Sequence, residues 1–226
     1  MSRSDDPLTP WELLSWISGL SDCNTLCVDC GAGTTGTANF LARAFSRSVA
    51  LDINPVLGTC SQNVETLTGS ANRLPFDTST VDLLISIQAF HHFDQEEHLS
   101  EAKRVVRPGG VFAALCWGEM QVPDPVSRAY AGVFEAIAPY WETARSDVLS
   151  GYPNLSIEGQ PMTFPTTFRC HSVTLDQFEE SVATWSALQS ALRAEAEIPM
   201  PNERDLEKVE NVFEVRWPLI GRVFRV

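Results

Sequence analysis

The sequence predicts an α/β fold built on a doubly wound, largely parallel sheet. Short apolar runs that predict buried strands alternate with segments that predict helices, and parallel neighbours require such crossovers. The run Leu26 to Cys30, LCVDC, leads directly into glycines at 31, 33 and 36. This pattern is typical of a buried strand that turns sharply into a helix. With 226 residues and 44% hydrophobic content, the chain suits one substantial domain.

The elements follow in a regular order. Strands are expected near residues 25–30, 48–52, 64–69, 81–88, 110–117, 163–171 and 215–225. Helices are expected over residues 8–20, 37–45, 94–106, 126–138, 175–196 and 203–211. Only the segment INPVLGTCSQ separates the second strand from the third, so the crossover helix there should be short.

Two of these helices carry clear capping signals. Thr9 can cap the leading helix, with Pro10 at its first helical position. Asp94 can cap the helix over 94–106, which has acidic residues in its first turn and basic residues in its last. Pro108 is expected to stop that helix. We expect it to serve as a scaffold element.

Composition excludes several classes of protein. A formal net charge of −13 disfavours a nucleic-acid partner, because such binding depends on clustered Lys and Arg. No apolar run reaches the roughly 18 residues that a membrane span needs, and the first ten residues lack a signal-peptide core. The six cysteines show no secreted disulfide framework. We therefore expect a cytoplasmic protein with no membrane partner.

The glycine-rich loop fits two cofactor classes. Gly31-Ala-Gly33-Thr-Thr-Gly36 matches G-x-G-x-x-G, and Asp52 lies about 20 residues further on, as in dinucleotide-binding folds. Asp29, two residues before the first glycine, favours another ligand. A carboxylate there would repel a pyrophosphate, but it could receive the ammonium group of S-adenosylmethionine. An NAD-dependent oxidoreductase stays as a minor alternative, although nothing downstream provides a hydride-transfer site.

At this loop the chain resembles the class I S-adenosylmethionine-dependent methyltransferases, whose first motif is an acid followed by G-x-G. The resemblance continues through residues 63–93, with a Leu-Pro-Phe turn and a Val-Asp-Leu strand, and through the Pro-Gly-Gly turn at 108–110. With the WSA and VRWPL segments it covers nearly the whole chain. It looks most like the trans-aconitate methyltransferase-like branch of small-molecule O-methyltransferases. One departure is Thr35, where the family usually has its third glycine.

The resemblance implies a Rossmann-like, seven-stranded, mostly parallel sheet with an antiparallel last strand. It also implies S-adenosylmethionine as cofactor. The positions that it places at the methionine end are Asp29, Gly31, Ala32, Gly33, Gln88 and Phe90. Those that it places at the ribose and adenine are Asp52, Ile53, Ser70, Ala71 and Asn72. Asp52 is the sharpest of these expectations, because one carboxylate can accept hydrogen bonds from both ribose hydroxyls.

After the fifth strand the pattern changes to a proline-punctuated region, residues 118–163, rich in aromatic side chains. We treat residues 1–226 as one domain in which this region is a lid over the acceptor site, because insertions at the carboxyl ends of parallel strands lie above the ligand crevice. Trp117, Tyr130 and Tyr140 would then line the acceptor pocket. The alternative is that the aromatic residues of the insertion pack its own small core, and that Trp117 packs in the main core.

His91 is the candidate catalytic residue. It matches the first position of the family's His-Trp-Phe or His-His-Phe tripeptide, and histidine titrates in the useful range. Methyl transfer from a sulfonium mainly needs alignment and exclusion of water. A carboxylate acceptor would need no base, whereas a hydroxyl would benefit from one. His91 could line the site, act as that base, or be a structural histidine that holds its loop.

Cys23, Cys27 and Cys30 have the C-x3-C-x2-C spacing of radical S-adenosylmethionine enzymes. The competing interpretation is that Cys27 and Cys30 are small packing residues of the first strand and its turn, and no metal is expected. The sequence therefore predicts methyl transfer to a small-molecule acceptor, by O-methylation of a carboxylate or hydroxyl. The alternative is a cofactor-binding protein without turnover, or a supporting subunit of a methyltransferase complex.

Overall fold

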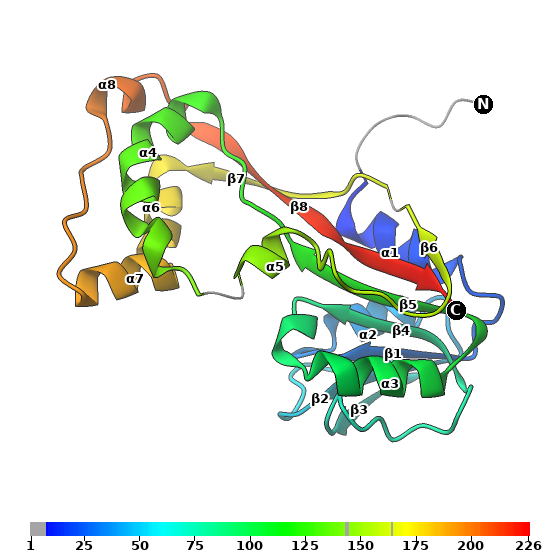
Figure 1. Ribbon diagram of the computed structural model, residues 1–226. Coiled ribbons are helices and arrows are strands. Elements are labelled where there is room, and N and C mark those ends of the chain that lie inside the picture. The colour runs from blue at the N-terminus through cyan, green and yellow to red at the C-terminus, as the bar shows by residue number, and fades with distance from the viewer. Residues whose placement is uncertain (1–7, 143–144, 164) are drawn as a thin grey trace. The chain divides into compact units, whose positions relative to one another are not determined.

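The computed structural model describes residues 8–142, 145–163 and 165–226 (Figure 1). The strands are β1 (Leu26–Cys30), β2 (Arg47–Asp52), β3 (Val64–Thr68), β4 (Val81–Ile87), β5 (Val106–Trp117), β6 (Gln160–Met162), β7 (Phe168–Thr174) and β8 (Val212–Arg225). The helices are α1 (Pro10–Ser18), α2 (Gly36–Leu41), α3 (Gln95–Val105), α4 (Asp124–Ile137), α5 (Arg145–Leu149), α6 (Leu175–Ala183), α7 (Ser186–Arg193) and α8 (Glu203–Leu206). Two short 3-10 helices are η1 (Phe90–His92) and η2 (Ala138–Tyr140).

The strands form one sheet in the order β3-β2-β1-β4-β5-β8-β6, and β7 pairs with β8. The first five in this order run parallel, and β8 is antiparallel to both β5 and β6. The predicted α/β class, with a mostly parallel sheet and an antiparallel last strand, is confirmed. The expected strand count was wrong by one, because two strands, β6 and β7, stand where one strand near 163–171 was expected.

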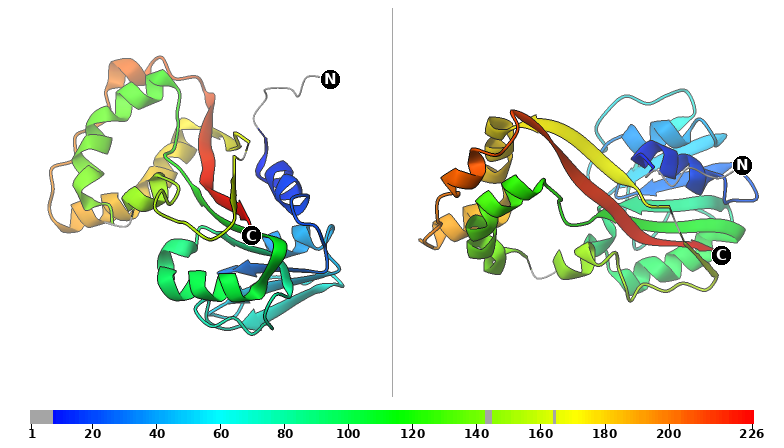
Figure 2. Two further views of the ribbon diagram at one scale, coloured as in Figure 1. Left: turned by 45° about the vertical axis from the view of Figure 1, so that its right-hand side comes forward. Right: turned by 90° about the horizontal axis from the view of Figure 1, so that it is seen from above.

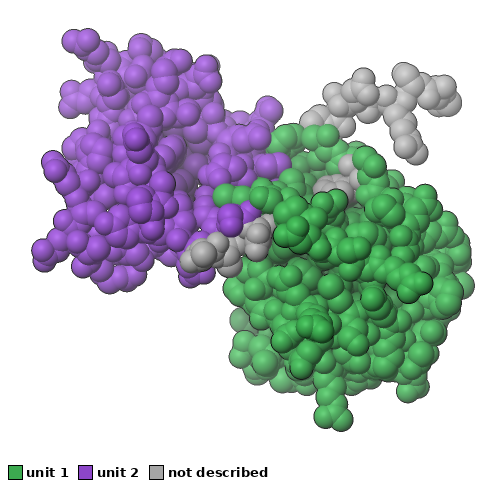
Figure 3. All heavy atoms as spheres, viewed as in Figure 1, with its two compact units in different colours: residues 1–118, 147–168, 219–226 green, residues 119–146, 169–218 purple. Residues whose placement is uncertain are grey.

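The chain divides into two compact units, which Figure 3 shows in different colours. Unit 1 comprises residues 1–118, 147–168 and 219–226. Unit 2 comprises residues 119–146 and 169–218. The segment expected as a lid, 118–163, is therefore shared: residues 119–146 belong to unit 2, whereas residues 118 and 147–163 belong to unit 1.

Unit 1 has three layers, with α1 and α2 on one face of the sheet and α3 on the other (Figures 1 and 2). Side chains alternate along a strand, so neighbouring residues of β1 point to opposite faces. Cys27 packs with the helices α1 and α2, through residues such as Leu13 and Leu41. Val28 packs on the other face with Ala102 of α3. Both faces of β1 are therefore buried, which explains its continuous apolar run.

The capping predictions are confirmed. Thr9 and Glu12 form a capping box at the start of α1, with Pro10 at the first position. The Asp94 carboxylate accepts a hydrogen bond from the backbone N–H of Glu97 at the start of α3. The helix ends at Val105, before Pro108, because the chain has already entered β5.

Several other boundaries were wrong. The helix expected over 175–196 is two helices, α6 and α7, with a break at residues 184–185 where the Thr184 hydroxyl bonds back to the Ser181 carbonyl. The helix α2 ends at Leu41 rather than 45, and α8 ends at Leu206 rather than 211. Residues 53–63 contain no helix at all, because Gly58 adopts φ +117° and the segment pairs with the glycine-rich loop.

Unit 2 has its own apolar core, formed by α4, α6, β7 and the first part of β8. Tyr130 is only 3% exposed in this core, and its ring meets that of Phe178 edge to face at 5.1 Å. Its hydroxyl donates a hydrogen bond to Glu179. Within the ranges that the structure describes, no helix is both long and apolar enough to cross a membrane.

Candidate functional site

A hollow of about 390 Å³ lies in unit 1 where β1, β2, β3 and β4 end. In doubly wound sheets this edge is where ligands bind. The sequence-predicted positions that line it are Gly31, Asp52, Ile53, Ser70, Ala71, Asn72 and Gln88. The remaining lining residues are Leu51, Asn54, Gly69, Ala89, His92 and Phe93. All of these except Phe93 lie next to a predicted position in the sequence, and Phe93 lies two residues after His91, so only the spacing along the strand ends could have indicated them.

The glycine-rich loop needs its glycines for two different reasons. Gly31 has φ +76°, and a Cβ there would come within 2.4 Å of the Ala89 Cβ. Gly33 has φ +58° with no atom within 4 Å of the position that a Cβ would take. The first glycine is therefore required by packing, and the second leaves its backbone open to a ligand.

Asp52 ends β2 with its carboxylate already oriented. One oxygen accepts a hydrogen bond from the Gly33 N–H and the other accepts one from the Asn54 N–H, both at 2.9 Å. A carboxylate offers about four acceptor positions, so each oxygen can accept one more hydrogen bond. The arrangement suits two neighbouring hydroxyl groups, such as those of a ribose.

Asp29 is the most unusual charged group of the site. It is 2% exposed, and no hydrogen bond to its carboxylate occurs among the described residues. Burial, together with the nearby charge of Asp52, raises the pKa of Asp29 to about 7. A buried carboxylate without a partner is costly. It fits a ligand that brings a cation, as the ammonium group of S-adenosylmethionine does.

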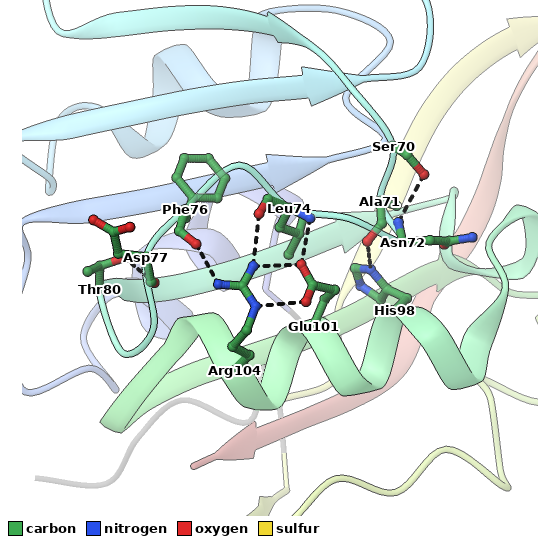
Figure 4. A network of polar contacts seen from close by, with 10 residues as sticks. All are labelled: Ser70, Ala71, Asn72, Leu74, Phe76, Asp77, Thr80, His98, Glu101 and Arg104. Carbon is green, nitrogen blue, oxygen red and sulfur yellow. Dashed lines mark hydrogen bonds and ion pairs between the residues drawn. The ribbon is translucent and has the colours of Figure 1, made fainter.

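The loop after β3 is held in place by α3 (Figure 4). Glu101 accepts a hydrogen bond from the Leu74 N–H at 2.7 Å, and Arg104 donates to the carbonyls of Leu74 and Phe76. Arg104 and Glu101 also form an ion pair. These contacts fix the segment that follows Ser70, Ala71 and Asn72, and so they shape one wall of the hollow.

His98 supports the same loop from below. Its Nδ1 lies 2.8 Å from the Ala71 carbonyl oxygen, and because a carbonyl only accepts, Nδ1 carries the proton. His98 is fully buried, and this burial lowers its pKa. This role of His98 could not be predicted from local sequence, since its partner Ala71 lies 27 positions away.

Gln88 follows β4 and holds two strand ends together. Its φ of +61° is rare for a residue with a side chain, and such strain concentrates at functional sites. The side-chain carbonyl oxygen accepts a hydrogen bond from the Trp117 N–H at 2.9 Å, and the Gln88 N–H donates to the Leu115 carbonyl. Gln88 therefore fastens the end of β4 to the end of β5.

His91 turns toward Tyr152, a residue that sequence reasoning did not assign to the site. The His91 Nδ1 and the Tyr152 hydroxyl oxygen are 3.0 Å apart. Tyr152 is 3% exposed and has φ +58°, and its ring packs edge to face on Phe90. His92, whose ring centroid is 4.0 Å from that of His91, lines the hollow instead.

Several predicted positions do not line this hollow. Phe90 is fully buried against Phe112, and Trp117 is half-buried at the end of β5. The predicted positions outside the lining residues are Asp29, Ala32, Gly33, Phe90, His91, Trp117, Tyr130 and Tyr140. Tyr130 and Tyr140 lie in unit 2, where Tyr140 packs beside α7.

Thr35, which stands at the family's third glycine position, points away from the hollow. It is 3% exposed, and its hydroxyl donates to the Thr59 carbonyl at 3.0 Å. A Cβ at Gly58 would lie 2.4 Å from the Thr35 Oγ1. The bulk of Thr35 is thus accommodated by a glycine in the loop after β2.

The geometry of β1 argues against an iron–sulfur cluster. Cys27 packs on the α1 and α2 face of the sheet and its thiol contacts the Ser48 hydroxyl at 3.1 Å. Cys30 packs on the α3 face, and Cys23 is exposed. Thiols on opposite faces of one strand cannot bind one cluster, so the packing interpretation of these cysteines holds.

The fold and this site define a class of protein. A glycine turn after β1, a carboxylate at the end of β2 and a mostly parallel sheet are features of Rossmann-like S-adenosylmethionine-dependent methyltransferases. Residues 28–114 match the family model described as a methyltransferase domain. The matched segment is therefore similar to a methyltransferase domain of this class, whose cofactor is S-adenosylmethionine.

Relatives with known names agree with this class. Over 118 residues the chain is 33% identical to a methyltransferase-like protein of Schizosaccharomyces pombe, covering 49% of this chain and 46% of that one. Over 105 residues it is 38% identical to the phthiotriol/phenolphthiotriol dimycocerosates methyltransferase of Mycobacterium leprae, covering 42% of this chain and 37% of that one. The chain thus spans less than half the length of these curated relatives.

A solved structure matches over nearly the full length. A protein proposed to be a type II methyltransferase, from Anaeromyxobacter dehalogenans, is 27% identical with a TM-score of 0.79, and the match covers 97% of each chain. The similarity therefore extends beyond the matched domain to both units of the chain.

Proposed function

We propose that this protein transfers a methyl group from S-adenosylmethionine to a small-molecule acceptor, by O-methylation of a carboxylate or hydroxyl. The sequence motifs favour the trans-aconitate methyltransferase-like branch. The observation that carries the proposal is the pair of carboxylates beside the glycine loop. Asp29 is buried without a hydrogen-bond partner among the described residues, and Asp52 is oriented with acceptor positions to spare.

S-adenosylmethionine, when bound, supplies a methyl group activated as a sulfonium. In the proposed complex Asp29 pairs with the ammonium group, and Asp52 accepts the two ribose hydroxyls. Ile53 flanks the adenine, and Ser70, Ala71 and Asn72 meet its edge from the loop after β3, which α3 holds in place. Prior fixation of these side chains reduces the ordering cost of binding. It also lets the protein align the acceptor with the methyl carbon.

The acceptor needs little help from a base. A carboxylate is ionised at neutral pH, so the chain has only to position it and exclude water. A hydroxyl acceptor would give up its proton, and His91 is the proposed recipient, with Tyr152 fixing its ring through the 3.0 Å contact to Nδ1. His92, which lines the hollow, is the neighbouring imidazole through which such a proton could pass.

The proposal includes a cytoplasmic location and a small molecule, rather than a nucleic acid, as partner. A net charge of −13 would oppose approach to a phosphate backbone. All six cysteines are free thiols, and such thiols persist in a reducing compartment.

The test combines binding with turnover. S-adenosylhomocysteine should bind in isothermal titration calorimetry and raise the melting temperature, whereas NAD should do neither. Asp52→Ala should weaken binding about 100-fold, because two hydrogen bonds to a charged group are lost. Asp124→Asn is the matched control, since the Asp124 side chain is 90% exposed in unit 2. Failure of S-adenosylhomocysteine to bind would remove the proposal.

Turnover is measured by release of S-adenosylhomocysteine in a screen of carboxylic acids and alcohols. Release with an acceptor supports the proposed transfer. Binding without release across the screen would favour the alternative, a cofactor-binding protein or supporting subunit.

A further inference from the structure

Unit 2 contains a second hollow, distinct from the cofactor site. Its volume is about 470 Å³, and all of its lining residues belong to unit 2. This volume lies within the range of small-molecule pockets, about 300–1,000 Å³. The hollow lies between α4, the start of α5 and the start of α7.

Three aromatic side chains form a continuous wall of this hollow. The rings of Phe134 and Trp185 stack with centroids 5.7 Å apart and an interplanar angle of 25°. Trp141 meets Trp185 at 5.8 Å and 46°. All three side chains line the hollow and are half-buried rather than sealed in a core. Such a wall favours a flat apolar ligand, which can stack on the rings or contact their edges.

One cation stands at the end of this wall. The Arg145 guanidinium lies over the Trp141 ring, 3.7 Å from its centroid, and pairs with the Glu119 carboxylate at 2.9 Å. The exposed fractions of the two side chains differ: 29% for Arg145 and 67% for Glu119. Arg145 is therefore fixed by the ring beneath it, whereas Glu119 lies largely in solvent.

The Glu119 carboxylate can be exchanged for another at little cost. An ion pair this exposed contributes little, and the displaced Glu119 side chain returns to water. Arg145 keeps a carboxylate partner throughout, so no buried charge is left unpaired. The planar guanidinium also suits a carboxylate better than an ammonium would. Glu119 thus occupies the position that the carboxylate of a ligand would take.

We propose that this hollow binds a flat aromatic or conjugated molecule that carries one carboxylate. The ring system lies against Phe134, Trp141 and Trp185, and the carboxylate replaces Glu119 on Arg145. None of its lining residues belongs to the cofactor hollow.

The test uses the full chain and 2-naphthoate as the probe, with 2-naphthylmethanol as its uncharged counterpart. Isothermal titration calorimetry should show one-site binding of 2-naphthoate with a dissociation constant of ~1 mM or tighter, as expected for a ligand of this size. Arg145→Gln should weaken 2-naphthoate at least about tenfold and change 2-naphthylmethanol less than about twofold. Arg128→Gln is the control, because Arg128 also forms exposed ion pairs in unit 2 but does not line the hollow.

Glu119→Gln supplies the decisive measurement. Removal of the competing carboxylate should tighten 2-naphthoate about two- to fivefold. A gain in affinity cannot come from misfolding. The proposal is overturned if the wild-type chain does not bind 2-naphthoate, if Arg145→Gln and Arg128→Gln behave alike, or if Glu119→Gln weakens binding. A parallel titration with S-adenosylhomocysteine separates failure of this site from failure of the proposed activity.

Discussion

Asp29 should make cofactor binding depend on pH. Its pKa of about 7 means that the free protein carries a largely protonated Asp29 at pH 6. An ammonium group pairs only with the ionised carboxylate, so binding below pH 7 must also remove a proton. We expect the dissociation constant of S-adenosylhomocysteine to rise about 50-fold between pH 7 and pH 5, approaching tenfold per pH unit.

Asp29→Asn should remove this dependence and leave weaker, nearly constant binding over the same range. Isothermal titration at pH 5, 6 and 7, in buffers with different ionisation enthalpies, measures both affinity and proton release. Wild-type protein should release about half a proton per ligand at pH 7, whereas the variant should release none. Asp124→Asn should behave as wild type. A flat pH profile for the wild-type chain would refute the reasoning.

The same carboxylate predicts an effect on stability without ligand. The pKa of Asp29 is higher in the folded protein, about 7, than the ordinary value of 3.8. Folding therefore favours the protonated form: this contribution is complete below pH 3.8 and is lost as pH rises through 7. At pH 8, Asp29→Asn should raise the free energy of unfolding by up to about 4 kcal/mol, with a smaller gain at pH 5. Urea denaturation at the two pH values measures this difference, and an equal effect at both would contradict it.

Two further variants test contacts around the site. Gly58→Ala should lower the free energy of unfolding, measured by urea denaturation, by about 2–5 kcal/mol, because residue 58 has a φ of +117° and the new Cβ would meet Thr35. Adding Thr35→Ala should recover part of this loss. If it recovers none, the contact with Thr35 is not the cause. Tyr152→Phe should lower the free energy of unfolding by about 1 kcal/mol, because a partly buried hydrogen bond is lost. It should also shift the NMR resonances of the His91 ring nitrogens, because Nδ1 loses its hydroxyl partner. Unchanged His91 resonances would show that the hydrogen bond does not form in solution.

Local signals made much of the fold predictable. The caps at Thr9 and Asp94 depend on residues three positions away, so the sequence shows the whole interaction. The glycine turn after β1 is equally local, because the positive φ of Gly31 and Gly33 belongs to the turn itself. The absence of a helix after β2 could not be predicted from local sequence, because Gly58 packs against Thr35, which lies on another segment.

The site shows the same division. Residues at the end of a strand or directly after it, such as Asp52 and Gln88, could be placed because parallel strands end at one edge of the sheet. Tyr152 could not, because it meets His91 across 61 positions of the chain. The sequence also could not show how deeply Asp29 is buried, because that depends on packing from both faces of the sheet. Sequence spacing therefore indicated many of the residues that line the hollow, but not the residues that hold them in place.

The loop after β2 explains how a costly group such as Asp29 can persist. Leu57 donates a hydrogen bond to the Gly33 carbonyl and accepts one from the Thr35 N–H, at 3.0 and 2.9 Å. Together with the Asp52 contact to Gly33, these bonds tie the ends of β1 and β2 into one frame that exists without ligand. None of these contacts supplies a hydrogen-bond donor to the Asp29 carboxylate. A cation bound beside Asp29 would offset part of the cost of burying this carboxylate, and we expect that gain to appear as affinity for a positively charged ligand.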